Sequence, residues 1–169
     1  MAEVVTGETR EEYNAKKLAE KPDIKPYTVN REYDVPYGAG TSKDGKTIYI
    51  DQRLPETVDD GHGVKINLGE SLPQHEYPEF MQMRRGMSYA NAHSHYANPS
   101  EKEYVEKQGG NWKGYDKNVQ ELVRNIEHSP NPKLPPDLYL KPYGKGCKGN
   151  KDNPQLSQLH KEAEHDHFG

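Results

Sequence analysis

The chain is poor in cysteine and in large apolar residues. Cys147 is the only cysteine among 169 residues, so no intrachain disulfide can form and a thiolate metal cluster is excluded. Hydrophobic residues make up 31% of the sequence, and no apolar run approaches the length of a membrane span. Any metal ion must therefore be held by histidine and carboxylate side chains, and we expect no membrane partner.

A strong positive charge is also missing. The formal net charge is -4, which argues against general nucleic-acid binding. Tyrosine replaces the usual large apolar residues, with 12 Tyr against 2 Phe and 1 Trp. Buried tyrosines need partners for their hydroxyl groups. We therefore expect a small core with extended polar ends.

Changes of composition along the chain predict three regions. Residues 1–26 form a charged arm, residues 27–143 a single α+β core domain, and residues 144–169 a linker with a polar tail. The beginning of the arm lacks the apolar segment of a signal peptide, so secretion by that route is not expected. The tail histidines at positions 160, 165 and 167 could gather a metal ion, but a solvated tail is the favoured interpretation.

The first half of the core is predicted to be a small β-hairpin or sheet. Asp44-Gly45 is a hairpin-turn signal, and a β-branched and aromatic run follows it. Gly38-Ala39-Gly40 is expected to be a flexible turn. The expected strands are residues 28–30, 33–37, 47–51 and 64–68.

The second half is predicted to be helical. A first helix runs from about Leu72 to Arg85 and ends at Gly86, and a second begins near Ser88. Asn98-Pro99 predicts a fresh helix start. Residues 112–126 predict a last core helix, with Trp112 and Tyr115 packed in the core.

The predicted site lies on the first of these helices. His75 and Glu79 are four residues apart, so a helix presents both on one face as ligands of a single divalent ion, with zinc the first choice. Glu76 follows His75 and can act as general base on a water, as the Glu of a His-Glu-x-x-His helix does. Proline at position 78 leaves one alternative open. If the regular helix begins at Pro78, His75 and Glu76 lie in a loop.

His93 is the predicted third ligand. Glu79 lies seven residues before Gly86 (86 − 79) and His93 seven after it (93 − 86), so an antiparallel helical hairpin places them at the same height. Glu101 is eight residues further on, and we expect it to support a histidine or to serve as a reserve ligand. His95 points away from His93 on an ideal helix and is the weaker candidate.

The order of these features resembles that of compact zincin-like metallopeptidases. In such proteins an edge strand, here residues 47–55, lines the cleft in front of a helix that carries His-Glu. A closer resemblance, to uncharacterised proteins of bacteriophages and prophages, rests on four segments: residues 43–47, the His-Glu-x-x-Glu segment 75–79, Ala92-His93, and residues 135–143. It spans about residues 33–143 and implies a viral origin, with the protein in the host cytoplasm or the virion.

Two functions follow from this resemblance together with the motif. One is a zincin-like metal-dependent hydrolase, with a peptidase as the favoured form. The other is a non-catalytic phage structural or accessory protein that binds other phage proteins, or itself, through its extended ends. A nuclease of the His-Asn-His kind is a distant third, because the spacing of the histidines fits it poorly.

Overall fold

The computed structural model describes residues 25–126 and 132–144. The predicted N-terminal arm lies almost entirely outside these residues, as do Cys147 and the tail histidines. The described chain has an α+β fold, in which a small mixed sheet and a hairpin precede three principal helices. Among the described residues, no helix combines the length and the apolar character needed to cross a membrane.

Three short strands form the sheet, in the order β1-β3-β2. Strand β1 (Thr28–Asn30) runs parallel to β3 (Thr47–Ile50), and β2 (Ala39–Thr41) pairs with β3 antiparallel. The predicted turn at Asp44-Gly45 joins β2 to β3. Gly45 has φ +73°, and a Cβ there would clash with the Phe80 ring, so the turn excludes larger residues and packs directly against the helical layer.

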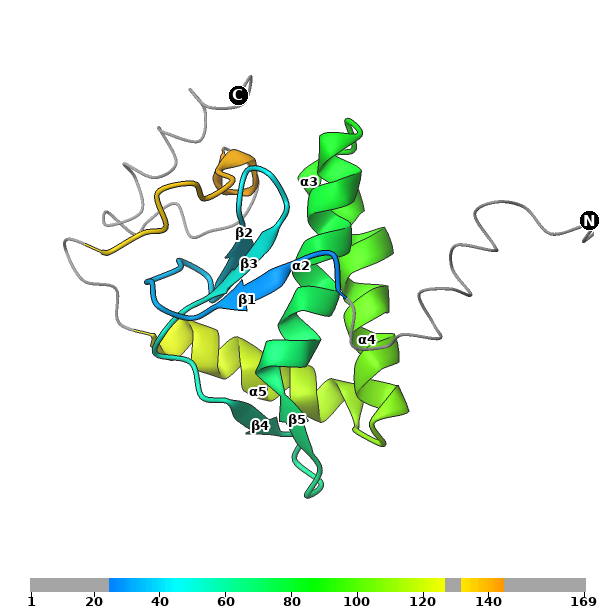
Figure 1. Ribbon diagram of the computed structural model, residues 1–169. Helices are drawn as coiled ribbons and strands as arrows, with labels where there is room; N and C mark the ends of the chain where they lie inside the picture. Colours follow the sequence, from blue (N-terminus) through cyan, green and yellow to red (C-terminus); the bar gives the residue numbers. More distant parts are fainter. Residues whose placement is uncertain (1–24, 127–131, 145–169) are drawn as a thin grey trace, which may run out of the picture.

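A second antiparallel pair follows, formed by β4 (Thr57–Asp59) and β5 (Lys65–Asn67). Asp60 lies in the loop between them, where its carboxylate accepts hydrogen bonds from the backbone N–H groups of His62, Val64 and Asn111. The last of these bonds connects the hairpin to the start of α5 (Trp112–Asn125). Figure 1 shows α5 below the sheet, with the hairpin beneath it.

The longest helix, α2 (Leu68–Arg84), begins at Asn67, whose side chain accepts a hydrogen bond from the Gly69 N–H. It is followed by α3 (Tyr89–Ala92), the π-helical turn η1 (His93–Ala97) and α4 (Asn98–Lys107), which continue one another. In Figure 1, α2 lies between the sheet and this second helical rod. One face of α2 is therefore buried against strands and another against helices.

The C-terminal part of the described chain covers the outer edge of β2. Tyr139 N–H donates to the Thr41 carbonyl at 2.7 Å, and Lys43 N–H donates to the Asp137 carbonyl at 2.7 Å. Leu138 and Tyr143, the latter in a short 3-10 turn η2 (Lys141–Tyr143), are buried in a cluster with Val35 and Tyr49. The larger apolar cluster lies between the sheet, the hairpin, α2, α4 and α5.

Several predictions about the strands were wrong. Residues 38–40 were expected to be a flexible turn, but β2 begins at Ala39, because this segment pairs with β3 across the Asp44-Gly45 turn. Residues 33–37 form bends and turns, with Tyr37 at φ +65°, a conformation that no strand contains. The strand at residues 47–50 is central in the sheet, not at its edge, and the edge strand β2 lies against α2.

The predicted first helix is confirmed, although it begins at Leu68, four residues before the expected start (72 − 68). It runs through both Pro73 and Pro78, so the alternative of a regular helix beginning at Pro78 is wrong. Helix α4 begins at Asn98 and ends at Lys107, as Asn98-Pro99 predicted, but it continues directly from η1, because Asn98 N–H donates to the His93 carbonyl. The Pro99 ring cannot fit against the carbonyl four residues earlier, and the wider π turn before it relieves that clash.

Candidate metal centre

Helix α2 carries three of the candidate functional side chains. Because it is continuous, His75 and Glu79 lie one turn apart on the same buried face, with the His75 Nε2 and Glu79 Oε2 atoms 3.2 Å apart. Glu76 is also buried, and its Oε2 is 3.7 Å from the same His75 nitrogen. The missing N–H of Pro78 costs α2 a hydrogen bond, and packing on two faces keeps the helix intact.

The turn at Gly86 brings the second histidine to this face. Gly86 has φ +99° and follows the last residues of α2, so the chain reverses direction there. This is the predicted turn, which lies seven residues after Glu79 and seven before His93. His93 Nδ1 consequently lies 3.0 Å from Glu79 Oε2. His95, the weaker candidate, is exposed on the same π turn.

His75, Glu79 and His93 form a group that could hold one metal ion. One ligand atom from each lies within 4.8 Å of the others. Ligands bound to zinc at about 2.0–2.1 Å in a tetrahedron stand roughly 3.3 Å apart. The two separations to the Glu79 oxygen, 3.2 and 3.0 Å, already match that value. The donor set of two imidazoles and one carboxylate suits zinc and its neighbours among divalent transition metals.

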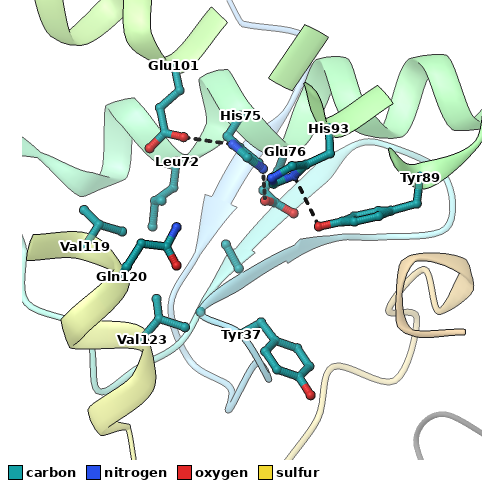
Figure 2. A pocket seen from close by; sticks show the side chains of 12 residues that line it. Tyr37, Leu72, His75, Glu76, Tyr89, His93, Glu101, Val119, Gln120 and Val123 are labelled. Atoms are coloured by element: carbon teal, nitrogen blue, oxygen red, sulfur yellow. Dashed lines mark hydrogen bonds and ion pairs between the residues drawn. The ribbon is translucent and has the colours of Figure 1, made fainter. Parts of the chain in front are cut away.

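The opposite side of the His75 ring is held by Glu101. Its Oε1 accepts a hydrogen bond of 2.8 Å from His75 Nδ1 (Figure 2). The other ring nitrogen, Nε2, is thereby turned toward Glu79. Glu101 Oε2 in turn lies 2.6 Å from the Tyr115 hydroxyl, and that hydroxyl lies 2.7 Å from Ser71 Oγ. Histidines that bind metals commonly donate their second N–H to a carboxylate in this way. Of the two roles expected for Glu101, the contacts match support of a histidine.

The π turn η1 makes this arrangement possible. Between His93 and Glu101 an ideal α-helix would turn through eight residues and leave the two side chains roughly 80° apart. A turn with i→i+5 hydrogen bonds rotates less per residue, so it reduces this offset. Both side chains therefore face α2, one beside Glu79 and the other beside His75.

Charge is concentrated here. The desolvation of buried His75 opposes its protonation, but its hydrogen bonds to Glu101 and Glu79 and the charge of Glu76 outweigh that effect and raise the pKa to about 10. Burial, followed by the neighbouring Glu101 charge, raises the pKa of Tyr115 above its ordinary value, so its hydroxyl stays protonated and donates to Glu101.

The group opens onto a pocket of about 250 Å³. Figure 2 shows His75, Glu76 and His93 along one side, Val119, Gln120 and Val123 of α5 along another, and Tyr37 opposite the histidines. The Tyr89 ring stacks on His93, and its hydroxyl lies 3.2 Å from the Nδ1 atom that faces Glu79. A small molecule in the pocket would therefore meet Glu76, the candidate ligands and a phenol together.

Sequence reasoning brought His75, Glu79, His93 and Glu101 together but missed Tyr89, Ser71 and the polar role of Tyr115. Tyr89 precedes His93 by four residues, a helical spacing that could have indicated the contact. Tyr115 was expected in the core, where it is buried. Its bond to Glu101 depends on how α5 packs against α4, which no local pattern reveals.

Comparisons of the chain with protein-family models, with curated proteins and with solved structures found no match.

Proposed function

We propose that this protein binds a divalent transition metal, zinc in the first instance, through His75, Glu79 and His93, and uses it to hydrolyse a peptide or related amide bond. One observation carries the proposal. Two imidazole nitrogens from different helices converge on a single buried carboxylate oxygen, at 3.2 and 3.0 Å, while a second buried carboxylate fixes the tautomer of one of them.

Glu76 is the proposed general base. A zinc ion at this position would polarise a substrate carbonyl and lower the pKa of a water. Glu76 lies on the pocket side of the group, where its carboxylate can take a proton from that water as the oxygen attacks the carbonyl carbon. The C–N bond then breaks, and Glu76 passes the proton to the leaving nitrogen. Water is consumed, and an acid and an amine are released.

Tyr89 is placed to assist. Its hydroxyl reaches the same region as the His93 nitrogen, and it can donate a hydrogen bond to the oxygen on which charge develops.

Departure from the His-Glu-x-x-His pattern makes the proposed site more negative, because Glu79 replaces a neutral histidine. A bound water would then be less acidic than in a three-histidine site, which favours a modest hydrolase.

The non-catalytic phage structural or accessory role is the second candidate. It is favoured by the fact that His75, once protonated, joins Glu79 and Glu101 in a buried network that is complete without a metal. The resemblance of residues 33–143 to phage and prophage proteins supports a viral setting for either candidate. The chain ends expected to bind partners lie outside the described residues.

Metal analysis of the untagged protein after zinc incubation and dialysis tests the first step. We expect about one zinc per chain for the wild type and for His95→Ala, the matched control on the same turn, and little for His93→Ala. Wild-type protein without zinc would overturn the metal site.

Glu76→Gln then separates the two candidates. As a hydrolase, the zinc-loaded variant should keep its metal and lose turnover of a peptide library by at least about 100-fold. Equal turnover in the two proteins would remove Glu76 from the mechanism. A zinc-loaded wild type that cleaves no member of the library would support the structural role.

A further inference from the structure

The pocket beside the candidate metal centre has two chemically different walls. One consists of His75, Glu76, His93 and Glu101, which carry the ionisable groups. The other is apolar and comes from three elements: Ala39 of β2, Leu72 of α2, and Val119 and Val123 of α5. Gln120 lines the pocket from the exposed side of α5. A molecule whose polar part contacts the ligands would thus place an adjoining group against the apolar wall.

The apolar part is bounded on one side by the backbone that enters β2. Gly38 has φ +97°, and a Cβ on it would lie 3.0 Å from the Val123 side chain and 3.4 Å from Leu54. This backbone therefore lies close to Val123 of α5. At about 250 Å³ the pocket is smaller than the roughly 300–1,000 Å³ of most small-molecule sites, so it suits one side chain better than several.

Access from the other side of the group is blocked. The space lined by Glu76, Glu79, Thr41 and Tyr139 measures about 10 Å³, about the minimum for one water. Tyr139 reaches this position because its N–H bonds to the Thr41 carbonyl on the outer edge of β2. A substrate strand that paired with the outer edge of β2 could not extend past Thr41, because Tyr139 already occupies that carbonyl. A substrate must therefore approach the candidate ligands through the pocket with the apolar wall.

The apolar part of the pocket, lined by Leu72, Val119 and Val123, forms a recess beside the candidate ligands. We propose that this recess is a specificity pocket for a medium-sized apolar side chain, such as that of leucine, next to the amide bond that is cleaved. The inference rests on the proposed function, since it assumes a carbonyl held at the metal. An acidic side chain would meet the carboxylates of Glu76 and Glu101. A basic side chain would lose hydration against Leu72, Val119 and Val123, and both oxygens of the nearby Glu101 carboxylate are already bonded, to His75 and to Tyr115. An apolar side chain incurs neither cost and buries surface.

Binding of hydroxamates to the zinc-loaded protein tests this without relying on turnover, because a hydroxamate ties the probe to the metal. The probes are the N-acetyl hydroxamates of glycine, leucine, aspartate and lysine, and isothermal titration gives their dissociation constants. We expect leucine to bind at least about tenfold more tightly than glycine, and aspartate and lysine no more tightly than glycine. Zinc content is measured on the same samples.

Val123→Phe should fill the recess. It should remove most of the leucine advantage while leaving glycine binding within about threefold of the wild type, because the metal ligands are untouched. Leu122→Phe is the matched control: the preceding residue of α5 lines a separate pocket with Pro55 and Val58. If circular dichroism shows that Val123→Phe is unfolded, Val123→Thr, which keeps the volume and adds a hydroxyl, should lower the leucine preference several-fold.

The outcomes separate the two proposals. Zinc-loaded protein that binds all four probes equally, prefers a charged one, or binds none overturns the apolar recess while the metal site stands. Equal leucine preference in wild type and Val123→Phe does the same. Protein that takes up no zinc overturns the proposed function and this inference together.

Discussion

Glu101 and His75 lie on different helices, yet the carboxylate of one is 2.8 Å from the ring nitrogen of the other. The contact links α4 to the middle of α2, and the Tyr115 hydroxyl extends it to α5. Three helices therefore determine the direction in which His75 Nε2 points. The candidate metal centre depends on this packing as much as on its own ligands.

Replacing Glu101 should weaken metal binding without abolishing it. In Glu101→Gln the amide can still meet His75, but without the charge that raises the basicity of the ring. We expect zinc affinity to fall about 10–100-fold, measured by competition with a chromophoric chelator. Glu103→Gln, an exposed change on the same helix that disturbs only the pair with Lys107, is the control. Equal affinities for the wild type and Glu101→Gln would contradict the positioning role.

Loss of the Tyr115 hydroxyl should act in the same direction but more weakly. Tyr115→Phe keeps the buried ring and removes the donor to Glu101 Oε2, leaving a buried carboxylate oxygen with one partner fewer. We expect a loss of about 1–3 kcal/mol in the free energy of unfolding and a smaller decrease in zinc affinity than in Glu101→Gln. Chemical denaturation and the same chelator competition measure the two effects. A larger affinity loss than Glu101→Gln would refute this order.

The stability of the metal-free protein should depend on pH through His75. Its pKa in the folded protein is about 10, against 6.5 for the unperturbed group. A raised folded pKa means that the folded state holds the proton more tightly. The contribution is therefore complete below about pH 6.5 and is lost as the pH rises toward 10. We expect stability to fall by a few kcal/mol across this window, followed by urea unfolding at successive pH values.

A His75→Gln variant is the control for that profile. Its decline between pH 6.5 and 10 should be clearly shallower, because the titrating ring is gone. Parallel profiles for the two proteins would assign the pH dependence to other groups. Saturating zinc should also flatten the wild-type profile, since a metal replaces the proton on the ring.

Pro78→Ala should stabilise the protein. The change restores an N–H that can donate to the Gln74 carbonyl in the middle of α2, and it removes a ring that crowds the preceding turn. We expect a gain of up to about 3 kcal/mol in the free energy of unfolding, seen as a higher melting temperature. Pro55→Ala, at an exposed position outside any helix, should be neutral or slightly destabilising. A lower melting temperature for Pro78→Ala would show that the proline is needed by its neighbours.

Local geometry explains which parts of the site the sequence predicts. Two relationships depend only on helical geometry and a single turn. One is the four-residue spacing of His75 and Glu79, and the other is the position of His93 opposite Glu79 across the turn at Gly86. The structure shows both contacts. The Ala39–Thr41 strand was missed because alternating glycines are typical of turns, and its strand character comes from pairing with β3. Tyr115 reached Glu101 through packing between elements distant in sequence, which composition does not encode.

Residues 137–139 cover the outer edge of β2, and this contact between distant parts of the sequence affects the order of folding. The candidate ligands and Glu101 lie within residues 75–101, so their contacts close short loops. Thr41 and Tyr139 are 98 residues apart (139 − 41), and joining them requires a much longer loop. Since contacts between distant residues form more slowly, we expect the helical hairpin to assemble first and the sheet edge to be covered last. A nascent chain would therefore complete the residues of the candidate metal centre before the segment that covers the outer edge of β2 has been synthesised.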